Sequence, residues 1–290
     1  TSELPKGSSD ALKKLSEAGV IEIADDEARR APAVYDSGRV HNRPPLTPCQ
    51  QRAFDELYAA LDGGGRFLLH GVTGSGKTEV YMRIIEELLS RGCTAILLVP
   101  EISLTPQMAE QFTARFGDLC ALLHSRLSAG ERFDEWRRVR RGEARVVIGA
   151  RSAVFAPVEN LGAIIIDEEH ESSYLADNYP SYDAREIAQE RCAINRALLL
   201  LGSATPSVST YMRTLAGVRP ENKLTLIEMA ERVNRRALPE VKIIDLRKEL
   251  LRGNRSIFSG ELKQALDETF RAGEQAILFL NRRGYSTFVS

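Results

Sequence analysis

The chain has 290 residues, of which 43% are hydrophobic, and its 39 Lys and Arg residues against 40 Asp and Glu residues leave a net charge of -1 at pH 7 with histidine neutral. This length favours two domains over one, and the balanced charge means that contact with a polyanion would depend on local basic patches. No stretch reaches the apolar length of a membrane span, and the N-terminus lacks the pattern of a signal peptide.

The first segment predicts a helix, a turn and a strand. SSDALKKLSEAGVIEI combines a Ser/Asp cap with Ala11, Leu12 and Leu15 at helical spacing and a stop at Gly19, and a short strand follows at 20–23. The next stretch, up to residue 45, is rich in Pro, Gly and polar residues and indicates a linker. Because Thr1 is not an initiator Met and the chain stops just after an apolar run, we expect a fragment.

From Leu46 onwards, apolar runs of strand length alternate with helical patterns. We expect strands at 67–70, 95–99, 120–123, 146–148, 163–166 and 197–201, and helices at 77–90, 106–116, 129–141 and 184–193. Continuous apolar strands separated by helices predict a parallel sheet covered on both faces. After a second irregular stretch, a strand at 241–245, a helix at 260–272 and a strand at 275–280 predict the start of another α/β unit.

A phosphate-binding loop is predicted at GVTGSGKT, where Gly71, Gly76, Lys77 and Thr78 fit GxxxxGK[ST] between a strand and a helix. Glycines let backbone N–H groups face phosphate oxygens, and the helix adds its positive dipole end. A plain strand-to-helix turn needs one glycine and gives no reason for the Lys-Thr pair. We therefore expect ATP at the following residues, with Thr78 also on Mg²⁺: Gly71, Thr73, Gly74, Ser75, Gly76, Lys77 and Thr78.

The run LGAIIIDEEH places Asp167 and Glu168 after an apolar strand, at the edge where ligands bind in open α/β sheets. We expect Asp167 to hold Mg²⁺ and Glu168 to orient and deprotonate the attacking water, so that Lys77, Asp167 and Glu168 are the catalytic residues. Alone, such residues usually form a solvated loop. Glu169 is left as a supporting or surface residue.

A third apolar strand, LLLLGSATPS, ends in Ser203 and Thr205, which could simply make a turn or a helix cap. The order GxxxxGK[ST], DExH and SAT, however, resembles that of superfamily 2 helicases. The resemblance implies a RecA-like P-loop lobe in which His170 hydrogen-bonds Ser203 and Thr205 and couples hydrolysis to movement of a second lobe; otherwise His170 is a solvated or core histidine.

Within that superfamily, GVTGSGKTEVY, LVPEISLTPQ, LLHSRLSAGER, VIGARSAVFAP, DEEHESSY, LGSATPS and ILFLNRRGYS resemble the bacterial replication restart helicases in their order. The resemblance implies an ATP-dependent 3′→5′ DNA helicase that recognises stalled or abandoned forks and initiates restart. Its partners would be forked and single-stranded DNA, single-stranded DNA-binding protein and primosome or helicase-loading proteins. We expect a monomer in the bacterial cytoplasm, at the nucleoid.

The same resemblance implies a domain order: a partial winged helix at 1–31, a linker at 32–45, helicase lobe 1 at 46–228 and the start of lobe 2 at 229–290. In this family a zinc-binding insertion follows NRRGYS. Its ligands are not in this chain, whose four cysteines lie far apart without a CxxC pair, so the cofactors expected of this chain are ATP and Mg²⁺. We do not expect the fragment alone to unwind DNA.

Further residues follow from the resemblance. Gln50 of LTPCQ would contact adenine, although LTPxQ also fits a helix cap. The expected DNA contacts are Thr105, Arg151, Ser152, Tyr174, Tyr179, Tyr182 and Arg185, by phosphate binding or base stacking. Ordinary strand-to-helix loops and core packing of one of these tyrosines are the alternatives. The aromatic loop lacks the family's tryptophan, because the single Trp is Trp136.

EWRRVRRGEAR is most simply a solvated helix face. Two other functions stay open: a superfamily 2 translocase for RNA or chromatin, and a fork-loading scaffold whose nucleotide site is idle.

Overall fold

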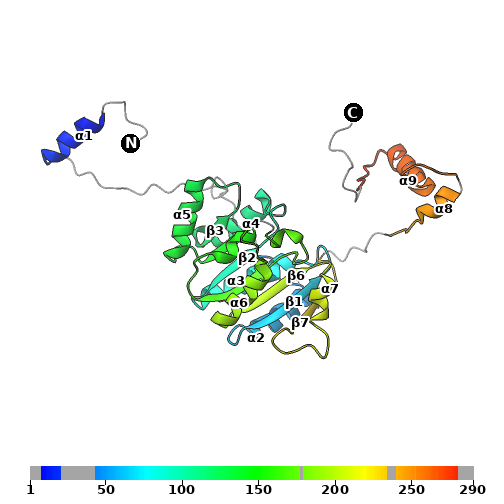
Figure 1. Cartoon of the computed structure of the whole chain (residues 1–290), viewed down its shortest axis with the longest axis horizontal. Helices are drawn as coiled ribbons and strands as arrows, with labels where there is room; N and C mark the ends of the chain where they lie inside the picture. Colours follow the sequence, from blue (N-terminus) through cyan, green and yellow to red (C-terminus); the bar gives the residue numbers. More distant parts are fainter. Residues whose placement is uncertain (1–7, 21–42, 177–178, 234–239, 252, 280–290) are drawn as a thin grey trace. The chain divides into compact units, whose positions relative to one another are not determined.

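The computed structural model describes residues 8–20, 43–176, 179–233, 240–251 and 253–279, with side chains from residue 13 onwards. The chain divides into two compact units, Thr1–Arg235 and Arg236–Ser290. Among the described residues, the first unit contains the sheet and the helices around it, and the second contains two helices (Figure 1).

The described part of the first unit is built on a seven-stranded sheet in the order β3-β4-β2-β5-β6-β1-β7. All neighbouring strands are parallel. The strands are β1 (Gly65–Gly71), β2 (Thr94–Leu98), β3 (Cys120–Leu123), β4 (Val146–Gly149), β5 (Leu161–Ile166), β6 (Leu198–Ser203) and β7 (Thr225–Met229). The predicted parallel α/β sheet is confirmed; β7 was not predicted.

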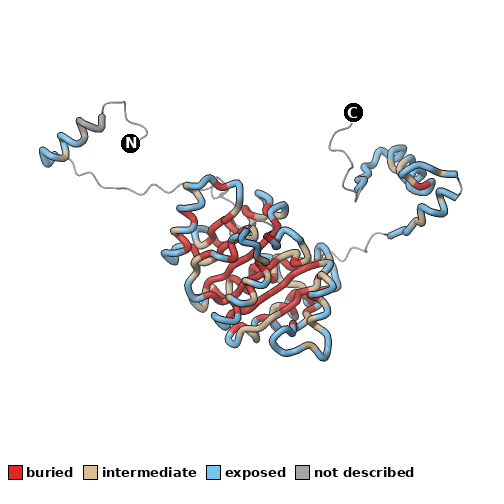
Figure 2. The backbone as a smooth tube through the Cα atoms, viewed as in Figure 1, coloured by how far each residue is buried: buried red, intermediate tan, exposed pale blue. Residues whose placement is uncertain are grey.

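Strands β2 to β6 are buried along their whole length (Figure 2). Since the side chains of a strand alternate between the two faces of a sheet, both faces must be covered, and helices cover them. One apolar cluster joins Leu69, Leu97 and Ile165 to the helices α2, α3 and α4, and the other joins Leu68 and Ile164 to α5 and α6. These helices are α2 (Pro48–Ala59), α3 (Lys77–Ser90), α4 (Pro106–Phe116), α5 (Ala129–Arg140) and α6 (Ala184–Asn195). Short helices complete the unit: η2 (Gly117–Leu119), η3 (Arg151–Phe155), η4 (Ser172–Tyr174) and α7 (Val208–Met212).

Helix α5 corrects the expectation of a solvated charged face. Glu135 is fully buried and Arg138 is 7% exposed, and their side chains form an ion pair at 2.9 Å. Because β3 is an edge strand, its outer backbone groups need partners: Glu135 accepts from the N–H of Leu122, and Arg138 donates to the carbonyl of Cys120. The charged side chains of Glu135 and Arg138 therefore satisfy backbone groups at the edge of the sheet.

Helix α1 (Ser8–Glu17) confirms the first predicted helix, whereas the winged helix remains a prediction because most of 1–31 lies outside the described residues. The second unit contains α8 (Leu246–Leu251) followed by α9 (Gly260–Arg271). The bounds of α9 agree with the helix predicted at 260–272 to within one residue. The strands predicted at 241–245 and 275–280 are wrong where they are described: 241–245 and 275–279 have no strand conformation. A strand needs a neighbouring strand to pair with, and no strand pairs with these residues within the part described.

Candidate active site

The loop from Gly71 to Lys77 joins the end of β1 to the first residue of α3, as GxxxxGK[ST] predicts. Gly74 and Gly76 have φ of 82° and 81°, a region that glycine adopts at little cost. At Gly71 a side chain would collide, because its Cβ would lie 2.7 Å from the hydroxyl of Ser75. The glycines therefore let the backbone turn tightly around the space in front of the helix.

A buried cation and an unpaired hydroxyl lie inside this loop. Lys77 is 8% exposed, and its Nζ donates to the carbonyl of Gly71 at 2.9 Å. The Oγ of Ser75 is buried and has no hydrogen-bond partner within the described structure. Thr73 is exposed and Thr78 half-buried. Lysine, hydroxyls and the end of a helix form a donor set suited to a nucleotide phosphate.

Two carboxylates from the end of β5 face the same loop. The Oε1 of Glu168 lies 3.9 Å from the Nζ of Lys77, and Glu168 has φ of 46°, which is uncommon for a residue with a side chain. Burial, and then the charge of Glu168, raises the pKa of the neighbouring Asp167. Asp167 and Glu168 thus follow β5, which is two strands away from β1 in the sheet.

Tyr81 of α3 fixes the position of Asp167. Its hydroxyl donates to Oδ1 of Asp167 at 3.0 Å, and the side chain is fully buried. Burial, and then the charge of Asp167, raises the pKa of Tyr81, so the phenol stays protonated. Gly202 of β6 leaves room for it, since a Cβ there would lie 1.7 Å from the Tyr81 hydroxyl. Sequence reasoning missed this contact because nothing marks a tyrosine in an amphipathic helix as a partner of a distant aspartate.

His170 lies against the end of β6. Its Nδ1 is 2.8 Å from the Oγ of Ser203, and that Oγ also accepts from the backbone N–H of Thr205 at 3.0 Å. The Oε2 of Glu168 lies 3.6 Å from Nδ1 of His170. The structure therefore brings His170, Ser203 and Thr205 together, and Thr205 joins through its backbone.

Glu169 is fully buried and supports the start of α7. Its carboxylate accepts from the backbone N–H of Ser207 at 2.7 Å and from the hydroxyl of Thr210 at 2.8 Å. The sequence left this residue undecided between a surface and a supporting position. The contacts make it a support that ties the acidic motif to the residues after SAT.

Gln50 lies at the start of α2, beside the phosphate-binding loop. It completes a capping box with Thr47 at the start of α2, and its Nε2 donates to the carbonyl of Gly76 at 3.2 Å. The helix-cap interpretation is confirmed, and the adenine contact stays a prediction for a residue that touches the phosphate-binding loop.

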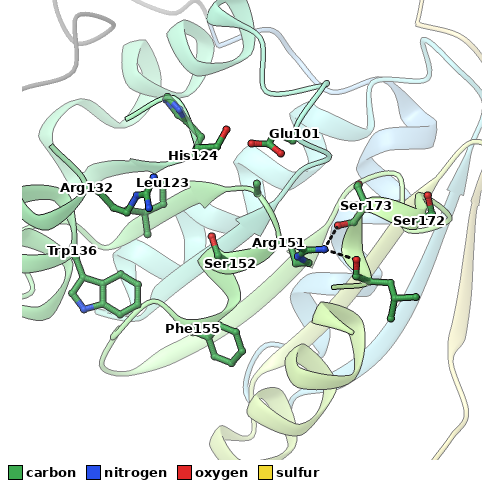
Figure 3. Close-up of a pocket in the computed structure, with 13 residues that line it drawn as sticks. Glu101, Leu123, His124, Arg132, Trp136, Arg151, Ser152, Phe155, Ser172 and Ser173 are labelled. Atoms are coloured by element: carbon green, nitrogen blue, oxygen red, sulfur yellow. Dashed lines mark hydrogen bonds between the residues drawn. The ribbon is translucent and has the colours of Figure 1, made fainter. Parts of the chain in front are cut away.

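The expected DNA-binding residues fall into different environments. Thr105 caps α4 with its hydroxyl, Arg151 donates to the carbonyls of Ser173 and Leu175, and Arg185 pairs with Asp183 at 2.6 Å. Ser152 and Arg151 line a cavity (Figure 3). Tyr179 is 99% exposed, whereas Tyr182 is half-buried, with its ring 5.0 Å from that of Phe155.

Tyr174 requires a correction. The side chain is fully buried, and its hydroxyl donates to the carbonyls of Asp167 and Leu98. It has no open face on which a base could stack. A phenol packs in a core when its hydroxyl finds a partner, and here the ends of β2 and β5 supply two.

The described residues contain no group of three or more His, Cys, Asp or Glu side chains arranged to hold a metal ion, and Cys49, Cys93, Cys120 and Cys192 are free thiols. The predicted Mg²⁺ ligands, Asp167 and the Thr78 hydroxyl, stay a prediction. Among the described helices, none has the length and apolarity that crossing a membrane requires.

Comparison with known proteins adds a family and close relatives. The DEAD/DEAH box helicase family matches residues 47–214. The replication restart protein PriA of Bacillus subtilis is 50% identical over 284 residues, covering 97% of this chain and 35% of that protein. The PriA of Synechocystis sp. is 46% identical over 287 residues, covering 98% and 34%. The chain thus spans about a third of the length of these relatives.

Among solved structures, RecG bound to a three-way DNA junction aligns with a TM-score of 0.47 and 23% identity, covering 72% of this chain and 28% of RecG.

Proposed function

Because this chain belongs to the DEAD/DEAH box helicase family, we propose that it forms the ATP-hydrolysing part of a bacterial DNA helicase that restarts replication at stalled or abandoned forks. The convergence of Lys77, Asp167 and Glu168 on one glycine-rich loop carries the proposal. The names of the two bacterial relatives support the biological role.

In this proposal the loop binds the phosphates of ATP. The chain residues expected to contact them are Gly71, Thr73, Gly74, Ser75, Gly76, Lys77 and Thr78, with Gln50 at the adenine. Lys77 would exchange its contact with the Gly71 carbonyl for phosphate oxygens. The free hydroxyl of Ser75 is one further donor beside them.

Glu168 would act as the base that orients the attacking water and accepts its proton. Its carboxylate lies 3.9 Å from the Lys77 ammonium, which would hold the phosphate that the water attacks. Thr78 and Asp167 would hold Mg²⁺, which, when bound, shields phosphate charge. Tyr81 keeps the Asp167 carboxylate in place.

The contact between His170 and Ser203 would connect the nucleotide to DNA, since it joins the acidic motif to the end of β6. Thr105, Arg151, Ser152, Tyr179, Tyr182 and Arg185 are the proposed contacts with single-stranded or forked DNA. Single-stranded DNA-binding protein and helicase-loading proteins are the proposed partners, in the cytoplasm at the nucleoid. Zinc is not among the cofactors proposed for this chain.

ATP hydrolysis by the full-length protein tests the proposal. We expect Lys77→Ala to abolish DNA-stimulated turnover, with exposed Lys223→Ala as the control. Glu168→Gln should retain ATP binding and lose turnover, with Glu190→Gln on the exposed face of α6 as the control. Undiminished turnover in Lys77→Ala would contradict the assignment.

The two other functions have their own outcomes. Stronger stimulation by RNA than by forked DNA would favour a translocase for another substrate. An inactive wild-type protein that still loads partners at forks would favour a scaffold with an idle nucleotide site.

A further inference from the structure

The cavity lined by Arg151 and Ser152 lies on the same edge of the sheet as the phosphate-binding loop, over other strands. It has a volume of about 660 Å³, within the usual size of small-molecule sites of ~300–1,000 Å³. Its walls come from segments that follow β2, β3, β4 and β5, and from α5 (Figure 3). Because β5 and β6 separate β1 from β2, this cavity is distinct from the phosphate-binding loop.

Two partly exposed aromatic side chains line it. Trp136 of α5 is 37% exposed and Phe155 of η3 is 45% exposed. Arg132 lines it too, one helical turn before Trp136, so both project from one face of α5. Large aromatics left open beside a cation provide faces on which a planar ring can stack.

His124 also lines the cavity. Its Nδ1 is buried, so this atom is closed off from a ligand in the open cavity, and it has no hydrogen-bond partner in the part of the chain that the structure describes. Burial, and then the charge of Arg126, lowers the pKa of His124, so the imidazole ring adds no positive charge to the wall at neutral pH.

The charges of the cavity wall are mixed. Arg132 and Arg151 line the wall together with Glu101 (Figure 3). The two arginines suit the phosphates of a strand, and the aromatic side chains suit a planar ring. A nucleic acid base attached to its phosphate backbone meets both conditions.

We propose that this cavity receives one unstacked base of the single strand, with Trp136 and Phe155 as its stacking surfaces and Arg132 beside them. The proposal rests on the proposed function, because it assumes a single-stranded nucleic acid on this edge of the sheet. It adds a base-specific contact to the phosphate contacts expected of Arg151 and Ser152.

The test uses the full-length protein and oligo-dT strands in which one base at a time is replaced by an abasic site. For the wild type we expect one position at which the missing base weakens binding about ten-fold, the effect of losing one stacked base. In Trp136→Ala and in Phe155→Ala the intact strand should bind about ten-fold more weakly, and the abasic site at that position should cost nothing further.

Phe133→Ala is the matched control, because Phe133 is on α5, is 62% exposed and does not line the cavity. ATP hydrolysis without DNA shows whether each variant is folded. If the abasic position keeps its full effect in Trp136→Ala and Phe155→Ala, the inference is wrong while the proposed function stands. If the wild type binds no single strand and hydrolyses no ATP, the proposed function itself fails.

Discussion

The hydroxyl of Tyr81 donates a hydrogen bond of 3.0 Å to Oδ1 of Asp167, across 86 positions of the sequence. The bond connects the helix that follows the phosphate-binding loop to the strand that supplies the acidic residues. Both halves of the candidate active site are therefore held at a fixed separation before any ligand binds.

Tyr81→Phe removes this hydrogen bond and little else. We expect turnover of ATP by the full-length protein to fall about ten-fold, because a hydrogen bond to a charged group contributes about 1.5–3 kcal/mol and ten-fold in rate corresponds to about 1.4 kcal/mol. Steady-state ATPase assays measure it. Tyr58→Phe, which removes a hydroxyl from a residue that is 42% exposed, is the control. Equal rates in Tyr81→Phe and the wild type would contradict a positioning role.

Glu169→Ala should destabilise the start of α7. The substitution leaves the N–H of Ser207 and the hydroxyl of Thr210 without their acceptor, at a cost of about 2–4 kcal/mol in the free energy of unfolding. Urea unfolding with hydrogen exchange of residues 198–212 measures the change.

Two further variants separate hydrogen bonding from simple loss of a side chain. Glu169→Gln keeps an acceptor oxygen and should lose less stability. Exposed Glu190→Ala should change the free energy of unfolding by less than ~0.5 kcal/mol. Equal loss in Glu169→Gln and Glu169→Ala would argue against the hydrogen bonds as the cause.

His170 and Ser203 should behave as one unit. Because Nδ1 and Oγ are 2.8 Å apart, we expect His170→Ala and Ser203→Ala each to reduce DNA-stimulated ATP turnover, and the double variant to lose no more than the more impaired single variant. A double-mutant cycle on turnover measures the coupling energy. Losses that simply add would mean that the contact does not connect the two residues functionally.

The four thiols should differ in reactivity. Cys93 is half-buried, whereas Cys49, Cys120 and Cys192 are 7%, 0% and 3% exposed. Burial raises the pKa of Cys192 to about 12, so its reactive thiolate is scarce at pH 8. We expect a disulfide reagent to modify Cys93 first among the four. Peptide mass spectrometry at successive times measures the order of modification. Modification of Cys192 as fast as Cys93 would contradict the burial.

The same shift predicts a stability change at alkaline pH. Below the ordinary thiol pKa of about 8.5, Cys192 is protonated in both the folded and the unfolded chain, so it adds no pH dependence. From there to about 12 the unfolded chain loses the proton while the folded chain keeps it, and stability falls. Cys192→Ala should therefore show a shallower loss of unfolding free energy from pH 8.5 to 11 than the wild type; parallel curves would exclude this cause.

The sequence predicted the local elements of the sheet well, because each signal lies within a few residues. Gly76 and Lys77 mark the start of α3, and Thr105 before a proline marks the start of α4. Strand β7 was not predicted because its sequence, TLIEM, has no continuous apolar run. Glu228 interrupts the apolar residues, and only Ile227 and Met229 of the strand are buried. Its place beside β1 follows from packing.

The candidate site was predictable as a set of motifs and not as a set of contacts. Motif order identified Lys77, Asp167, Glu168, His170 and Ser203, whereas the partner of Asp167 depended on strand register and helix rotation, which a pattern does not contain. The same limit explains Tyr174, since a tyrosine after an acidic motif has the same letters whether its ring is inside or outside.

Gly202 adds a historical consequence to this arrangement. A methyl group at that position would lie 1.7 Å from the Tyr81 hydroxyl, so Ala at 202 requires the tyrosine side chain to move or to be replaced by a smaller one. We therefore expect a smaller residue at 81 to precede any larger residue at 202. Among diverged relatives, the two positions should covary, and a pairing of Tyr with a larger residue at the second position should be rare.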